Sequence, residues 1–170
     1  MKSRLAIGIG CRRGCSGDSI ADLVRHAVTL VSRYPSRHDR DGKSWCDLFE
    51  ASLSGRSLPA AGPCERLLVP EEKQNETTLF TSERKRDEPG MAAAATALGL
   101  PLVYLSQLAL SAAAARCKTR SARVEDMIGL PSLAEAAAIA GAGLGSRLLL
   151  ERISSRGATC AIATLAEEEP

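Results

Sequence analysis

The chain has 170 residues, of which 22 are basic and 20 acidic, so its formal net charge is only +2. This balance excludes a dedicated nucleic-acid binder whose affinity rests on many phosphate contacts, and an aromatic content of 3% excludes a base-stacking surface. The length fits a single domain that buries about 70% of the surface of its unfolded chain.

The first predicted element is an apolar strand at residues 5–10, followed by a short polar loop and a helix. Glycine lets backbone N–H groups approach a ligand, and a helix start adds unpaired donors and a positive dipole end. Arginine adds a planar fork that matches carboxylate or phosphate. The sequence therefore predicts an anion-binding loop that includes Gly8, Gly10, Cys11, Arg12, Arg13 and Gly14.

This loop fits neither of the common phosphate-binding motifs. A dinucleotide fingerprint requires a third glycine where Arg13 stands, and a Walker A loop requires a Gly-Lys-Ser/Thr run that the chain lacks. The paired arginines then become the distinguishing feature. They predict a ligand with several carboxylates or phosphates.

The rest of the chain alternates predicted helices and strands, interrupted by a polar insertion at about 35–76. Apolar residues at helical spacing predict the first helix, which stops before Tyr34. Beyond the insertion we expect a strand at 77–81, a helix from about 88 to 98, a strand at 102–105 and a short helix capped by Ser106. Residues 129–135 open a further helix that runs to about 142, and a hairpin with strands at 147–153 and 158–165 closes the chain.

This order predicts one α/β domain of three layers, α/β/α, with a mixed, mostly parallel sheet and a C-terminal antiparallel hairpin. Ligands bind such sheets at the carboxyl ends of the strands, so the loops at 8–14 and 82–90 are expected to share one rim. Lys85 and Glu88 in the second loop are candidate ligand contacts, although Glu88 also suits a helix start. Ser132 and Glu135 are further candidates, and their Ser-x-x-Glu spacing favours a capping box instead.

The six cysteines contain no Cys-x-x-Cys pair and only two histidines accompany them, so we predict free thiols and no metal site. Cys11 and Cys15 flank two arginines near a helix start, a setting that lowers a thiol pKa. No catalytic residue can be assigned from spacing alone. The apolar run at residues 5–10 is too short for a signal peptide or a membrane span, so a cytoplasmic protein without a membrane partner is expected.

Three ordered blocks resemble a known family. They read G-I-G-C-R-R-G from Gly8, T-S-E-R-K-R-D-E-P-G from Thr81 and G-L-P-S-L-A-E-A-A-A from Gly129. In these blocks and in its closing strand the chain is similar to CobE and to the C-terminal domain of CbiG, proteins of cobalamin (vitamin B12) biosynthesis. The family usually has a short connection where this chain carries the insertion at 35–76.

The resemblance implies a corrin-ring ligand of the precorrin or hydrogenobyrinic acid type, a broad apolar macrocycle edged with carboxylates. It favours a protein that binds or carries this intermediate, with no cofactor, over a stand-alone hydrolase, because CbiG opens its ring lactone with additional domains. Two alternatives stay open. One is a hydrolase or isomerase that uses Cys11 or Lys85, and the other is an adaptor that contacts other enzymes of the pathway through the insertion.

Overall fold

The computed structural model describes residues 5–33 and 77–165, and in it five strands form one mixed sheet in the order β3-β2-β1-β5-β4. β1, β2 and β3 are parallel, whereas β5 runs antiparallel to both β1 and β4. The predicted insertion at 35–76 lies outside the described residues. The strands are β1 (Leu5–Cys11), β2 (Thr77–Ser82), β3 (Leu102–Leu105), β4 (Ser146–Ser155) and β5 (Ala158–Leu165).

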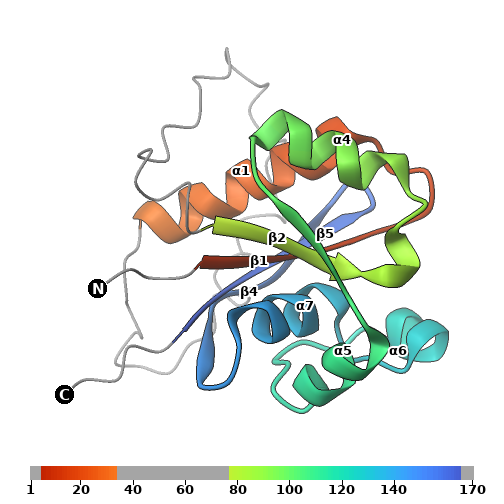
Figure 1. The fold of residues 1–170 in the computed structure, drawn as a ribbon, viewed down its shortest axis with the longest axis vertical. Coiled ribbons are helices and arrows are strands. Elements are labelled where there is room, and N and C mark those ends of the chain that lie inside the picture. Colours follow the sequence, from red (N-terminus) through yellow and green to blue (C-terminus); the bar gives the residue numbers. More distant parts are fainter. Residues whose placement is uncertain (1–4, 34–76, 166–170) are drawn as a thin grey trace, which may run out of the picture.

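Helices cover both faces of the sheet, which confirms the predicted three-layer α/β architecture (Figure 1). One face carries α1 (Gly17–Arg33) and α4 (Pro89–Leu98). The opposite face carries α5 (Gln107–Ala114), α6 (Ala122–Ile128) and α7 (Leu133–Ala142). A short 3-10 turn, η1 (Glu83–Lys85), joins β2 to α4.

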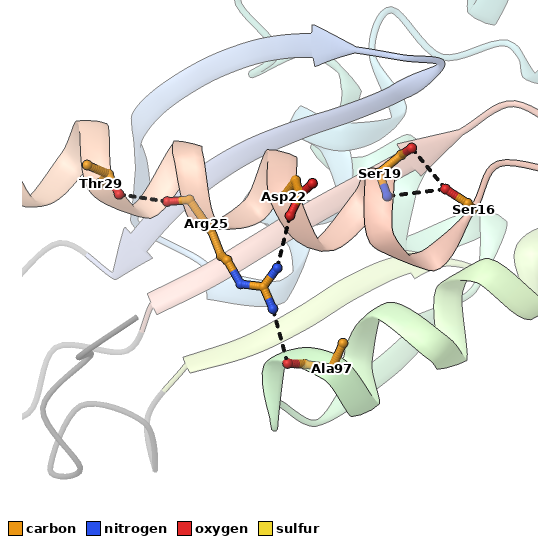
Figure 2. Close-up of polar contacts among 6 residues, drawn as sticks. All are labelled: Ser16, Ser19, Asp22, Arg25, Thr29 and Ala97. Carbon is orange, nitrogen blue, oxygen red and sulfur yellow. Dashed lines mark hydrogen bonds and ion pairs between the residues drawn. The ribbon is translucent and has the colours of Figure 1, made fainter. Parts of the chain in front are cut away.

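Helix α1 is held at its start by a side-chain cap and along its length by the neighbouring helix. Ser16 Oγ accepts a hydrogen bond from Ser19 N at 3.3 Å, which satisfies one of the unpaired donors at the helix start. Further along, Arg25 pairs with Asp22 at 3.0 Å and donates to the carbonyl of Ala97 at 3.4 Å (Figure 2). The second bond ties α1 to the last turn of α4.

The two faces of β1 meet very different helices. Ile7 and Ile9 pack in the apolar core under α1 and α4, whereas Ala6 and Gly8 face α7. A Cβ atom on Gly8 would lie 1.9 Å from the carbonyl oxygen of Ala134 and 2.4 Å from the amide nitrogen of Ala138. Glycine at this position therefore lets the backbone of α7 lie directly against the strand.

The C-terminal hairpin turns more tightly than the sequence suggests. The predicted four-residue turn at 154–157 shrinks to two residues, because Ser154 and Ser155 still pair with β5. Arg156 and Gly157 have φ angles of 47° and 85°, the left-handed pair of a type I′ turn. Such a turn matches the right-handed twist of the strands it joins, which lets β4 extend to Ser155.

We predict that Gly8→Ala destabilises the domain by about 3 kcal/mol, because the new methyl group would collide with helix backbone that cannot rotate away. Gly10→Ala is the matched control in the same strand. Its Cβ would meet the Thr159 hydroxyl at 2.6 Å, and that side chain can move. Urea unfolding of both variants measures the difference, and an equal loss of stability would contradict the close contact of β1 with α7.

Candidate ligand-binding site at the carboxyl ends of the strands

Three segments that are distant in sequence meet at one edge of the sheet. β1 and β2 are parallel and end together, and β5 starts opposite the end of β1, where Ala158 pairs with Cys11. We call this edge the rim and define it by residues 11–16, 83–88 and 154–157. The expectation that the first two loops share one edge is confirmed, since Gly14 N donates to Glu88 Oε2 at 3.0 Å.

Glu88 is the centre of this contact. Its Oε1 atom lies 3.9 Å from Lys85 Nζ, and the side chains of Lys85 and Glu88 are only 21% and 13% exposed. Glu88 also occupies the N-cap position of α4, as its place before Pro89 suggested, but its side chain makes no cap hydrogen bond. The carboxylate instead bridges the two loops and neutralises part of the charge of Lys85.

Two further amides of the first loop donate to acceptors inside the protein. Arg12 N donates to the carbonyl of Gly157 at 2.8 Å, and Cys15 N donates to the carbonyl of Arg12 at 3.3 Å. The Cys15 thiol lies 3.7 Å from the carbonyl oxygen of Arg156. The amides of Arg12, Gly14 and Cys15 thus have internal acceptors, so these three amides are not free donors for an anion.

Those side chains make the rim basic. The three segments contain six basic and three acidic residues, and Arg12 and Arg13 are both exposed. The aliphatic part of Arg12 lies along Gly157, and a Cβ atom on Gly157 would lie 3.5 Å from Cδ of Arg12. The Arg86 guanidinium stacks over the Tyr104 ring at 4.9 Å. Guanidinium groups held in this way can bind several carboxylates at once.

The thiols of the rim do not have the low pKa that the sequence predicts. Burial raises the pKa of Cys11 to about 11, and the charge of Glu88 adds to this effect while Lys85 opposes it. The pKa of Cys15 is raised as well, mainly by burial. The prediction was wrong because desolvation of the thiolate outweighs the effect of the nearby cations, and burial is not visible in the sequence.

Within residues 5–33 and 77–165, no cluster of His, Cys, Asp and Glu side chains could hold a metal ion.

The remaining predicted site residues lie beneath the rim rather than on it. Gly8 and Gly10 are buried inside β1, against α7 and against Thr159 and Leu133 respectively. Ser132 and Glu135 are fully buried at the start of α7. These four residues are therefore separated from Arg12, Arg13 and Lys85, and the structure gives them packing and hydrogen-bonding partners within the fold.

Only half of the predicted capping box forms at α7. Ser132 Oγ accepts a hydrogen bond from Glu135 N at 3.4 Å, as expected. The carboxylate of Glu135 does not return to the backbone of Ser132. It accepts instead from Lys118 N at 2.6 Å and from Arg152 N at 2.9 Å, groups that come from other segments.

A shallow hollow of about 200 Å³ lies elsewhere, between α5 and α7. Its lining includes Ala112, Ala140 and Leu144, so it is mainly apolar. It lies by the C-terminal end of α7, whereas the N-terminal end of that helix faces the rim. The charged surface and the hollow are therefore separate features.

Comparison with known proteins gives the family. The family model described as "Cobalamin synthesis G C-terminus" matches residues 59–163, which is more than half of the chain. The chain belongs to this family. It is therefore a CobE- and CbiG-like protein of cobalamin biosynthesis, and the resemblance noted in the sequence is confirmed.

Solved structures extend the likeness to β1 and α1. The crystal structure of CobE, "a protein from the cobalamin (vitamin B12) biosynthetic pathway", has a TM-score of 0.69 and 29% identity over 99% of this chain and 95% of CobE. The cobalamin biosynthesis protein chiG from Agrobacterium tumefaciens has a TM-score of 0.53 and 28% identity over 94% and 96% of the two chains. No curated protein matches the sequence. None of the described helices is long and apolar enough to cross a membrane.

Sequence reasoning missed the contribution of the hairpin turn to the rim. The turn itself was predicted, and its Arg156-Gly157 pair is a recognisable signal for a tight hairpin. Its position beside Arg12 depends on β5 pairing with β1, which is a long-range contact. No local pattern in the chain indicates that pairing.

Cys11 should react slowly with iodoacetamide at neutral pH, because a pKa of about 11 lowers the thiolate fraction by about 100-fold or more relative to an ordinary thiol with a pKa of about 8.5. Mass spectrometry of the modified peptide measures the rate, with N-acetylcysteine as the reference. The rate should rise as the pH approaches 11. Neutral-pH modification of Cys11 at the rate of the reference would contradict the raised pKa.

Glu88→Ala should lower the free energy of unfolding by about 1 to 3 kcal/mol, because it removes a charge-assisted hydrogen bond that joins two loops. Glu83→Ala is the matched control, since Glu83 is an exposed carboxylate in the same segment. Chemical denaturation measures both variants. The bridging role of Glu88 is refuted if the two variants lose the same stability.

Proposed function

We propose that this chain binds a corrin-ring intermediate with several carboxylates, of the precorrin or hydrogenobyrinic acid type, at the rim. The observation that carries the proposal is that three segments with six basic residues meet at one edge of the sheet. Membership of a family named for cobalamin synthesis supports a ligand of the corrinoid class.

The arrangement suits a ligand with many carboxylates better than one with a single carboxylate. An exposed ion pair contributes little by itself because water and salt screen it. Arg12 and Arg13 lie in one loop and Arg156 lies in the hairpin turn beside it, so the rim offers guanidinium groups for more than one carboxylate. A macrocycle with acidic groups around its edge gains from several such pairs at once, and its apolar ring excludes water from them.

Binding or carriage of the intermediate fits the chemistry of the rim better than stand-alone hydrolysis. Hydrolysis through a thiolate requires a thiol that ionises near neutral pH, whereas the pKa of Cys11 is about 11. The ammonium group of Lys85 lies 3.9 Å from Oε1 of Glu88, so it already forms an ion pair within the rim. A carrier of this kind would receive its ligand from one enzyme of the pathway and pass it to another.

Replacement of both Arg12 and Arg13 by alanine should weaken binding of hydrogenobyrinic acid by about 10-fold or more, through the loss of two charge-assisted contacts. Titration followed by the absorption spectrum of the corrin ring measures the affinity. Arg147→Ala is a suitable control, because Arg147 is exposed at the opposite end of the sheet, where its partner Thr164 pairs with Leu5.

Two results would remove the proposal. One is the absence of any spectral change or co-purification when the purified chain is mixed with hydrogenobyrinic acid and with earlier precorrins. The other is a double variant that binds as tightly as the original chain. Turnover of an intermediate by the purified chain would instead support the enzymatic alternative.

A further inference from the structure

The buried carboxylate of Glu135 is the centre of a second network at the same end of the molecule. Its side chain is fully buried and accepts four hydrogen bonds. The donors are Lys118 N at 2.6 Å, Thr119 N at 3.0 Å, Thr119 Oγ1 at 2.7 Å and Arg152 N at 2.9 Å. Two donors meet each oxygen, so the acceptor capacity of the carboxylate is used up.

These donors belong to two segments that no regular secondary structure joins. Lys118 and Thr119 lie in the connection between α5 and α6, and Arg152 lies in β4. The pairing of β4 with β5 is irregular between Leu150 and Ile153, and the backbone N–H of Arg152 points to Glu135 there. Glu135 therefore fastens an irregular loop and an irregular strand to the first turn of α7.

The segments that this network joins also carry basic residues. Arg152 Nη2 donates to the carbonyl of Arg120 at 3.4 Å, which links the strand to the loop a second time. Lys118 is exposed, and the side chain of Arg120 is 71% exposed while it pairs with Glu125. We call Lys118, Arg120 and Arg152 the second basic cluster.

The second basic cluster lies at the rim end of the sheet. Leu133, in the same helical turn as Glu135, packs beside Gly10 near the end of β1. Ile153, next to Arg152, pairs with Cys160, which in turn pairs with Ile9. Figure 1 shows α6, which follows Arg120, at the end of the sheet where β1 leads into α1. The cluster thus extends the basic surface of the rim toward the face covered by α7.

We propose that the second basic cluster is a further carboxylate-binding surface for the same ligand, and that Glu135 is the positioning residue that holds it in place. This inference rests on the proposed function. A ligand with carboxylates around its whole edge needs cations on more than one side of the site, and the cluster supplies them on the α7 side. A buried charge is costly unless fully paired, and here its four bonds all serve the segments that carry the cations.

The first test compares single substitutions that each remove one positive charge. Lys118→Ala and Arg120→Ala should each weaken binding of hydrogenobyrinic acid by about 3- to 10-fold, the effect of one charge-assisted contact. Arg147→Ala, at the opposite end of the sheet, should leave the affinity within about two-fold. If the original chain binds and all three variants bind alike, the second surface is refuted while the proposed function stands.

The second test separates positioning from general stability by a double-mutant cycle. Glu135→Gln should weaken binding of hydrogenobyrinic acid. Lys118→Ala should then lower the affinity less in the Glu135→Gln background than in the original chain, because the lysine has already lost its placement. Arg12→Ala should lower the affinity equally in both backgrounds, since the contact made by Arg12 does not depend on Glu135. Thr119→Val, which removes one bond to Glu135, gives a milder variant for the same cycle should Glu135→Gln fold poorly.

The outcomes distinguish the two claims. The positioning role is refuted if the losses of affinity are additive when Lys118→Ala is combined with the Glu135 or the Thr119 variant. Failure of the original chain to bind hydrogenobyrinic acid at all removes the proposed function, and this inference with it.

Discussion

The close contact between β1 and α7 at Gly8 is the constraint on which the rest of the structure depends. Because the backbone of α7 lies against the strand, the first turn of the helix is brought to the end of β1, beside Gly10. That placement buries Glu135 where it can reach the loop before α6 and the irregular part of β4. A larger residue at Gly8 would move α7 outward and separate these segments.

In the proposed site, the arginine side chains of the rim bind the anion, since three of the loop amides already have internal acceptors. The Glu88 carboxylate accepts a hydrogen bond from Gly14 N, and the carbonyl of Gly157 in the hairpin turn accepts one from Arg12 N. These internal bonds make the loops rigid, so Arg12 and Arg13 extend from a defined base. Several guanidinium groups on segments joined in this way suit the proposed ligand, which carries several carboxylates around its edge.

The carboxylates of Glu88 and Glu135 have related roles. Glu88 joins the first two segments of the rim, and Glu135 joins the segments on the α7 side. Glu135 replaces its lost hydration with four hydrogen bonds, whereas Glu88 accepts the amide of Gly14 and pairs with Lys85. Both lie next to basic residues, and the surface that results is cationic even though the whole chain is nearly neutral. The distribution of charge, rather than its total, therefore supports the proposed ligand.

The sequence by itself determined the elements and the class of the fold. Apolar periodicity, the serine caps and Gly99 mark helices and strands that depend on local contacts, and the family blocks identify the pathway. Only the tertiary structure decided which residues meet. Gly14 contacts Glu88, and Glu135 accepts hydrogen bonds from distant segments. The burial that raises the pKa of Cys11 likewise depends on the packing of distant segments. Such contacts follow from strand order and helix packing, which no local spacing in the chain encodes.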